Sequence, residues 1–483
     1  MGNKFLKHFM VIGGGTFISM VIGFLTTPII TRIVSPTEYG QFSVFTMYSN
    51  MALMILYLGL DQALVRFFYE KETDQYRREL LFKCLKYPVI GTVVVATIVV
   101  ILAVTGLFQF ELGAASLLLV CIYTFIQIIY RFSLLLVRLQ YKSKLYSFLG
   151  IVQKSVYVIF AILFIYIGIF SDTISLAVAT VLAAFVCMVI SIVAERRLWN
   201  PRLLGQNECT ITQSELIKYA YPYIFSMGVT TLFQYIDKMS LNYYCSYEEV
   251  GIYSSTMTLV HVFSIIQTTF NTLWAPMAVE HYTKDKKDVS FYQKGNQIIT
   301  VIMFFIGFSL ILCKDIFSIL LGAKYREAAY ILPFLIFNPI MYTISETTVN
   351  GLVFKKKSNM QVVVSLGACI VNIIGNTLLV PKFGCQGAAI STGLSYIVFF
   401  TLRTVLSNKY FYVDFHLRKF YFITGVAVVY SFYNTFVTFN IGSILGYCLC
   451  VLLLVVFYFD AVKFGIMYIK SLIAGMLKKE KTI

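Results

Sequence analysis

The sequence predicts an all-α integral membrane protein with about fourteen transmembrane helices: two six-helix lobes related by a pseudo-two-fold axis, plus two extra C-terminal helices. The first observation behind this fold class is composition. Hydrophobic residues make up 59% of the 483 residues and charged residues 13%, and the mean hydropathy is +0.79. A soluble chain carries roughly 25% charged residues to wet its surface. Lipid must therefore solvate much of this surface.

The spans follow from the length of the apolar stretches. A helix that crosses a bilayer needs about 20 predominantly apolar residues. This window identifies about fourteen spans in chain order: 8–34, 41–69, 84–108, 112–137, 146–169, 174–194, 217–244, 251–279, 294–313, 328–354, 360–380, 387–407, 420–438 and 443–469. Pro333 and Pro339 both fall in the tenth span and make it the likeliest bent element.

The distribution of basic residues is the second observation. The formal net charge is +16, which in a soluble protein would suggest a nucleic-acid partner. With the N-terminus inside, about 30 of the 39 Lys and Arg residues fall on cytoplasmic ends and loops. The inner groups include Lys83, Arg138, Lys144, Arg196, Lys294, Lys355, Arg403 and Lys478, whereas Lys314, Lys324, Arg326 and Lys382 fall outside. The asymmetry predicts an even number of spans in a cytoplasmic (plasma or inner) membrane, both termini cytoplasmic, and no nucleic-acid partner.

An internal repeat is the third observation. Four residues at the start of the second span, Glu38, Gly40, Phe42 and Ser43, align without gaps with Glu249, Gly251, Tyr253 and Ser254 at the start of the eighth. A shift of six spans preserves orientation, so the two halves can be parallel repeats with a cavity between them. The expected division is an N-lobe at 1–215 with spans 1–6, a C-lobe at 216–412 with spans 7–12, and spans 13–14 with a cytoplasmic tail at 413–483. We attribute the repeated glycine to a tight reversal that excludes a Cβ.

Four stretches together resemble a known family. They are residues 25–40 (LTTPIITRIVSPTEYG), 59–67 (GLDQALVRF), 236–238 (IDK) followed by 249–254 (EVGIYS), and 381–392 (PKFGCQGAAIST). In this order the chain resembles Wzx-type polysaccharide flippases of the multidrug/oligosaccharidyl-lipid/polysaccharide exporter superfamily. The resemblance implies a transporter, not an enzyme, that moves a polyprenyl-pyrophosphate-linked oligosaccharide from the inner to the outer leaflet by alternating access for surface polysaccharide (exopolysaccharide) biosynthesis. It implies membrane lipids, a polysaccharide polymerase and other assembly proteins as partners.

Basic residues inside spans are candidates for binding the pyrophosphate. Ionisable side chains there cost roughly 2.5 kcal/mol or more, so each is a functional candidate. Arg66, Arg131 and Lys154 lie towards the inner ends of spans 2, 4 and 5, where a lipid pyrophosphate would need cations. The alternative is that they extend to the interface without a role in binding. Gln127, Gln234 and Gln267 are candidates for binding sugars in the cavity.

The remaining charged residues are candidates for gating or ion coupling. Asp61 and Glu346 are acids inside spans, and either could carry an exchanged H⁺ or Na⁺. The alternative is a static pair, for instance Asp61 with Arg131 or Lys154. Arg32 and Asp237 could form a salt bridge that breaks as an outer gate opens. Alternatively, these two residues and Lys238, which follows Asp237, could anchor their helices at the membrane interface. His261 is either a titrating residue or a hydrogen-bonded packing residue.

Other functions leave different signatures. The sequence contains no phosphate-binding Gly-rich loop with Lys-Ser/Thr, so energy must come from an ion gradient, the membrane potential or consumption of the product outside. The ten cysteines form no metal framework, and no cofactor is expected; a bond between Cys245 and Cys385 stays open. A flippase for a cell-wall precursor, the lipid-linked peptidoglycan unit, is the main rival. A multidrug exporter of the same superfamily would have about twelve spans, and a membrane polysaccharide polymerase would need catalytic residues on a large outer loop.

Overall fold

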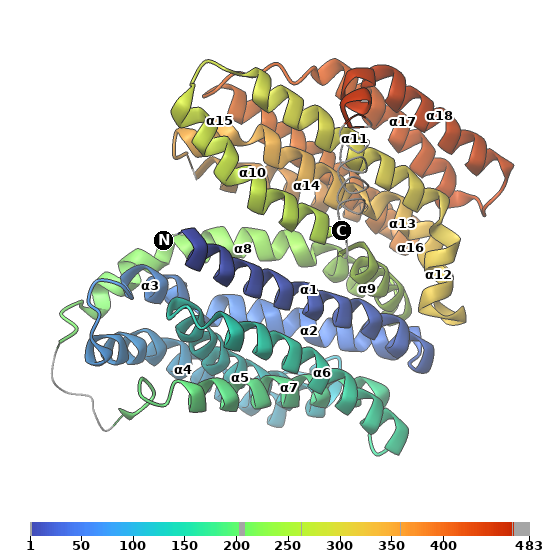
Figure 1. The fold of residues 1–483 in the computed structure, drawn as a ribbon. Helices are drawn as coiled ribbons and strands as arrows, with labels where there is room; N and C mark the ends of the chain where they lie inside the picture. Colours follow the sequence, from blue (N-terminus) through green and yellow to red (C-terminus); the bar gives the residue numbers. More distant parts are fainter. Residues whose placement is uncertain (1, 202–207, 262, 358, 466, 468–483) are drawn as a thin grey trace, which may run out of the picture. The chain divides into compact units, whose positions relative to one another are not determined.

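The computed structural model describes residues 2–201, 208–261, 263–357, 359–465 and 467, without the side chains of 2–13, 16 and 264. Throughout this part of the chain every regular element is a helix (Figure 1). The all-α class predicted from composition is therefore confirmed. The predicted cytoplasmic tail beyond 467 lies outside the described residues.

Packing divides the chain into two units, which are described separately. Unit 1 comprises Met1–Asn242 and Ser246–Ser254, and unit 2 comprises Tyr243–Cys245 and Ser255–Ile483. The helices of the first half are α1 (Gly2–Ile33), α2 (Pro36–Leu56), α3 (Leu60–Phe67), α4 (Asp74–Val104), α5 (Gly113–Leu139), α6 (Ser143–Ile167), α7 (Asp172–Ala194), α8 (Gln213–Tyr244) and α9 (Tyr247–His261). Those that follow are α10 (Ser264–Lys284), α11 (Ser290–Leu312), α12 (Lys314–Leu321), the 3₁₀ turn η2 (Ala323–Tyr325), α13 (Ala328–Leu335), α14 (Phe337–Thr348), α15 (Asn350–Phe354), α16 (Asn359–Asn408), α17 (Leu417–Phe436) and α18 (Ile441–Phe457).

The predicted lobe boundary at 215/216 falls in the first turn of α8, whereas packing assigns this helix to unit 1 as far as Asn242. Packing does not test whether 1–215 and 216–412 are repeats, or whether 413–483 is an addition, so that division stays a prediction. No disulfide links the ten cysteines, all of which lie in the described part of the chain.

The number of membrane spans is only partly supported. Each predicted span overlaps a helix or a broken helix. Among the described residues, eight helices are long and apolar enough to cross a membrane, or up to ten if each bent pair is one span. The helix α16 covers two predicted spans that meet at a kink at Gly384. The helices α8 and α17 are not among those that are long and apolar enough, and α1 contributes only the shorter apolar stretch Phe17–Ile33. The chain is a multi-pass membrane protein, and the number fourteen stays a prediction.

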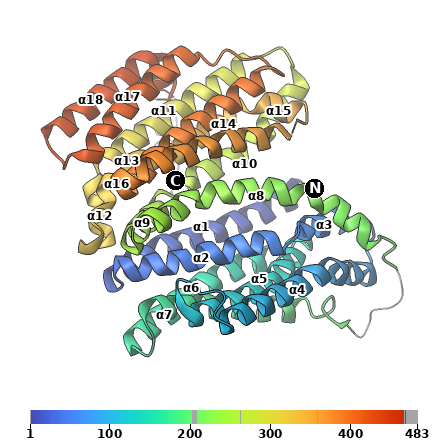
Figure 2. The same ribbon diagram turned by 180° about the vertical axis from the view of Figure 1, so that it is seen from behind.

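Small residues allow close helix packing in unit 1. The helix α6 packs on α1 and α7, and α5 packs on α7, as both views of the ribbon show (Figures 1 and 2). A Cβ at Gly15 of α1 would overlap Ser147 of α6, and a Cβ at Gly150 would lie 3.1 Å from Ser19 Oγ. Helices in lipid associate through such small-residue contacts because apolar burial gives them little advantage over lipid tails.

The sharpest bend in unit 1 falls between α2 and α3. Leu58 and Gly59 both have positive φ, 50° and 67°, and the two helices meet at 53°. The bend leaves Asp61 in the first turn of α3, where a helix N-terminus favours a carboxylate. The other bent pair, α18 with 459–465 at 92°, also lacks a proline at its break. The predicted span 10 is interrupted as its prolines suggest, because it is divided into α13, α14 and α15. The two bends of more than 40° lie at the breaks just described.

We expect Gly59→Ala to destabilise the protein by more than the cost of its backbone conformation. A left-handed residue with a Cβ costs roughly 1–2 kcal/mol, and this Cβ would also lie 2.5 Å from the carbonyl oxygen of Ala220. Gly106→Ala is the matched control, because Gly106 has φ +74° and nothing within 4 Å of its Cβ position. Thermal unfolding in detergent should show the larger drop for Gly59→Ala. Equal drops would contradict the close approach of Gly59 to Ala220.

Unit 2 is built around α14. This helix packs on α10, α11 and α16, while α13 packs on α16 and α17, and α18 packs on α11 and α17. All the described side chains of α13 except Tyr330 are buried, as are all those of α14 except Asn338 and Tyr342. The single acid of α14, Glu346, and the buried hydroxyls of this helix are therefore held inside protein rather than in lipid, which is where a membrane protein tolerates them.

Candidate functional site

A polar cavity of about 370 Å³ lies within unit 1. Helices α2, α3, α5 and α8 line it with Asn50, Leu53, Met54, Tyr57, Asp61, Gln127, Arg131, Ser226, Met227, Thr230, Thr231, Gln234 and Tyr235. Four of the predicted site residues, Asp61, Gln127, Arg131 and Gln234, are thereby brought together. Amides and hydroxyls dominate its polar wall, and these groups bind sugar hydroxyls.

The charged members of this cavity form an ion pair. Arg131 Nη2 lies 3.0 Å from Asp61 Oδ2, and Gln62 Nε2 donates to the same oxygen at 3.0 Å. The Asp61 side chain is fully buried, whereas that of Arg131 is 37% exposed. Asp61 therefore holds the guanidinium from behind while part of Arg131 stays accessible. The static pair considered for Asp61 is present in the structure, with Arg131 rather than Lys154.

The other two predicted pyrophosphate ligands lie elsewhere. Arg66 is 55% exposed at the end of α3 and lies 3.7 Å from Glu70, the arrangement of an ordinary surface pair worth at most about 1 kcal/mol. Lys154 of α6 is exposed beside Gly23 of α1. Among the described residues Lys154 has neither an ion pair nor a hydrogen bond, and it does not line the cavity. It is a cation left available inside a predicted span.

The repeated motif is a contact between its own two copies. Gly40 of α2 and Gly251 of α9 both lie inside helices, not in a reversal, so that explanation of the glycines is wrong. A Cβ at Gly40 would overlap the carbonyl oxygen of Tyr247, and a Cβ at Gly251 would overlap that of Pro36. Each glycine is required because the backbone of the other helix occupies the space of its Cβ.

Polar side chains reinforce this crossing. Ser43 Oγ donates to Ser254 Oγ at 2.6 Å, and Lys238 Nζ of α8 donates to Ser43 Oγ at 2.8 Å. Next to them Tyr253 donates to Asp237 Oδ2 at 2.7 Å. We call the set Gly40, Ser43, Lys238, Gly251 and Ser254 the clasp.

Arg32 takes no part in the clasp. Its side chain is exposed on α1, and among the described residues it forms no ion pair. The Asp237 carboxylate instead accepts the hydrogen bond from Tyr253. Tyr253 is thus the hydrogen-bond partner of Asp237 where Arg32 was expected. The exposure of Arg32 fits the alternative, in which it anchors α1 at the membrane interface.

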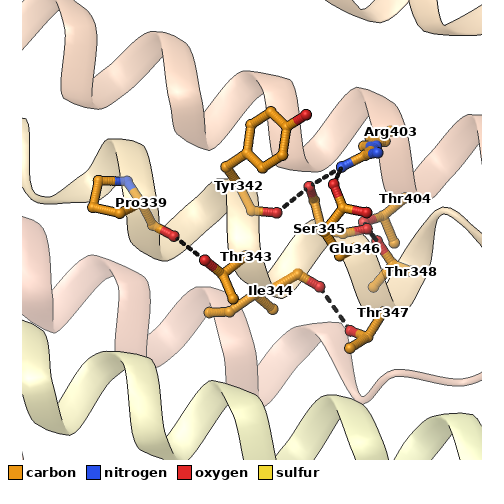
Figure 3. A network of polar contacts seen from close by, with 10 residues as sticks. All are labelled: Pro339, Tyr342, Thr343, Ile344, Ser345, Glu346, Thr347, Thr348, Arg403 and Thr404. Carbon is orange, nitrogen blue, oxygen red and sulfur yellow. Dashed lines mark hydrogen bonds and ion pairs between the residues drawn. The ribbon is translucent and has the colours of Figure 1, made fainter. Parts of the chain in front are cut away.

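A second buried ion pair lies in unit 2. Arg403 of α16 points at α14, where Nη1 lies 3.0 Å from Glu346 Oε1 and 2.6 Å from Ser345 Oγ (Figure 3). The side chains are 7% and 8% exposed, and the guanidinium also lies over the rings of Tyr342 and Phe399 at 5.3 and 5.6 Å. The sequence counted Arg403 among the basic residues of cytoplasmic ends and loops. The structure places it inside α16, which continues to Asn408, with its side chain buried.

The last two predicted residues lie outside both polar sites. Gln267 is half-buried on α10, and His261 is exposed at the end of α9. Sequence reasoning did not single out Arg403, Ser43 or Ser254 as site residues, although an acid in one span predicts a base in another. No group of metal ligands is found among the described residues.

Comparisons with known proteins place this geometry in a family. A family model described as polysaccharide biosynthesis protein matches residues 5–281. CapF of Staphylococcus aureus, a capsular polysaccharide biosynthesis protein, is 22% identical over 417 residues, which cover 84% of this chain and 99% of CapF. An uncharacterized membrane protein of Methanocaldococcus jannaschii, MJ1068, is 22% identical over 438 residues, which cover 85% of each chain.

Solved structures show the same fold. The lipid II flippase MurJ, in an inward closed conformation, has a TM-score of 0.68 at 14% identity, covering 94% of this chain and 100% of MurJ. An inward-facing multidrug resistance transporter of the MATE family has a TM-score of 0.60 at 12% identity, covering 82% of this chain and 94% of that one. These identities are low, so the likeness establishes the architecture of a membrane transporter and leaves the substrate to the site itself.

Proposed function

The chain belongs to the polysaccharide biosynthesis protein family, and from this premise we propose that it flips a polyprenyl-pyrophosphate-linked oligosaccharide from the inner to the outer leaflet of the cytoplasmic membrane by alternating access. The family membership agrees with the flippase resemblance of the sequence. The capsular role in the printed name of CapF supports a surface polysaccharide as the destination. The polymerase and the other assembly proteins would act on the flipped unit.

The observation that carries the proposal is the polar cavity among lipid-facing helices. Buried polar groups in a membrane are costly unless they serve a function or are fully paired. Six of the lining residues carry neutral amides or hydroxyls on their side chains, and these are Asn50, Gln127, Ser226, Thr230, Thr231 and Gln234. The two tyrosines of the lining, Tyr57 and Tyr235, offer rings on which a sugar can stack. A glycan fits this lining better than an apolar drug does.

Lys154 is the residue we assign to the pyrophosphate. It is the basic candidate of α6, and no acid pairs with it in the described part of the chain. A lysine ammonium acts as a point charge on phosphate oxygens and does not need fixed orientation. Arg66 is a weaker candidate, since Glu70 is its partner and solvent screens it.

An apolar groove in unit 2 suits the polyprenyl tail. It has a volume of about 800 Å³ between α17 and α18, and glycines 425, 442 and 446 open its wall. Its lining is mainly aliphatic and aromatic side chains such as Val429 and Leu453, and it includes the three tyrosines Tyr421, Tyr430 and Tyr433. We propose that the tail stays in lipid along this groove while the glycan moves.

Energy for transport would come from outside the chain. We propose coupling to H⁺ or Na⁺ or to consumption of the product, without a bound cofactor. Asp61 and Glu346 both hold an arginine in this structure. Either acid could carry an ion only if its pair opened during the cycle, so each is a coupling site only in a state with that pair broken.

Deletion of the gene should cause a complete glycan on polyprenyl pyrophosphate to accumulate in the inner leaflet. Lipid extraction and mass spectrometry measure it. Accumulation of the peptidoglycan precursor would instead assign the chain to cell-wall synthesis. Loss of the glycan chain itself would indicate an enzyme and overturn the proposal.

Lys154→Gln should reduce export by about tenfold or more, the size of one lost charge-assisted contact. Lys144→Gln is the matched control, because Lys144 is exposed on the same helix near its predicted cytoplasmic start. Surface glycan is measured at equal membrane levels of the variants. Equal export by both variants would remove Lys154 from the mechanism.

A further inference from the structure

We propose that Arg131 binds a carboxylate on the glycan, so that the transported oligosaccharide contains an acidic sugar of the uronic-acid type. This inference rests on the proposed function and narrows its substrate class. It separates two roles that the sequence assigned together: Lys154 meets the pyrophosphate, and Arg131 meets the sugar. The argument depends on charge, burial and position of these two cations.

The first step is that the cavity could bind a neutral sugar without any charged side chain. Its remaining polar side chains are amides and hydroxyls, which bind neutral glycans by themselves. A buried ion pair is often no more stable than neutral residues of the same shape. The pair Asp61–Arg131 therefore indicates that something charged is recognised in the cavity.

The second step is the sign of the accessible charge. Asp61 is fully buried and Arg131 is 37% exposed, so the ligand meets a guanidinium and not the acid behind it. Only one contact, from Nη2 to Asp61 Oδ2 at 3.0 Å, ties the guanidinium to its partner. The guanidinium of Arg131 therefore keeps free N–H donors, and two N–H groups of an arginine match the two oxygens of a carboxylate.

The third step is the size of the charge. Asp61 cancels the net charge of Arg131, so the pair as a whole is neutral. A pyrophosphate carries at least two negative charges, which a pair of zero net charge compensates only weakly. A single carboxylate brings only one negative charge to be compensated. Its two hydrogen bonds require a guanidinium of fixed orientation, and Asp61 fixes the orientation of Arg131. Asp61 is thus a positioning residue for Arg131.

The fourth step is position. Gln127 precedes Arg131 by one helical turn on α5, so both side chains share a face. Gln234 and Tyr235 line the same cavity from α8. The guanidinium is therefore surrounded by sugar-binding groups, whereas Lys154 lies apart from this cavity on α6. A carboxylate attached to a sugar ring fits that surrounding.

The test uses the full chain in liposomes with two synthetic polyprenyl-pyrophosphate glycans that differ only by glucuronate or glucose at one position. A fluorescent label and a membrane-impermeant quencher report the flipping rate. We expect the wild-type protein to flip the glucuronate lipid at least about tenfold faster, the size of one charge-assisted hydrogen bond. Equal rates would overturn the inference and leave the proposed function standing. Failure to flip either lipid would overturn the proposed function itself.

The variant that isolates Arg131 is the double substitution Asp61→Asn/Arg131→Gln. Removing Arg131 alone would leave a buried carboxylate uncompensated and could prevent folding, whereas the double variant replaces the pair by neutral amides. We expect the ratio of the two rates to fall to about one. Lys154→Gln should slow both lipids by the same factor and so preserve the ratio. A ratio that survives in the double variant would overturn the role of Arg131.

Discussion

Ser43→Cys and Ser254→Cys introduced together should stop export under oxidising conditions, and a reductant should restore it. The two hydroxyl oxygens lie 2.6 Å apart, close enough for the substituted sulfurs to reach the bonded distance of about 2.05 Å after a small adjustment. Ser43 lies in the N-terminal half of α2 and Ser254 at the middle of α9, and the predicted topology assigns the starts of both helices to the outer face. Under the proposed function, release of a large glycan requires that face to open, and a disulfide across the clasp would prevent it.

The measurement is surface glycan before and after reduction, with the fraction of cross-linked protein read from gels after proteolysis between the two positions. Each single cysteine variant is a control for the loss of the hydroxyl. The ten native cysteines form no disulfide with one another, but a version with these replaced removes any ambiguity. Full export by cross-linked protein would show that the clasp stays closed throughout transport.

Arg403→Ala should destabilise the protein by about 3–5 kcal/mol, because it leaves the Glu346 carboxylate buried without its cation. Both side chains are less than a tenth exposed, so solvent cannot replace the lost partner. The substitution also removes the ring contacts with Tyr342 and Phe399. Unfolding of the detergent-solubilised protein by heat or denaturant measures the loss of stability.

Two comparisons separate this cause from others. Glu346→Gln/Arg403→Gln should recover most of the stability, because it leaves no charge to be neutralised. Lys409→Ala, at an exposed basic residue just beyond α16, should change stability by no more than about 0.5 kcal/mol. Equal losses for Arg403→Ala and Lys409→Ala would contradict the account of the buried pair.

The sequence predicted the positions of the helices better than the contacts between them. Apolar length is a property of one segment, so the positions of the helices, from α1 to α18, followed from it. The pairing of Glu346 with Arg403 depends on which helices pack together, and hydropathy carries no such information. For the same reason Arg131 and Lys154 looked alike in the sequence, although only Arg131 has an acid beside it.

The bends and the repeat show a second limit. Proline predicted a bend in span 10, whereas Leu58 and Gly59 make the bend that positions Asp61. Backbone conformation at a non-proline residue is decided by its surroundings, here the close approach of Ala220. The repeat was found by aligning Gly40 with Gly251, but only the structure shows that the aligned residues touch each other.

The clasp has the form of a contact between two identical molecules, folded into one chain. In a two-fold symmetric dimer, residue i of one copy meets residue j of the other, and j meets i. Gly40 faces Tyr247 and Gly251 faces Pro36, and each glycine lies beside the other. Within a single chain, the clasp thus has the self-complementary geometry of a homodimer interface.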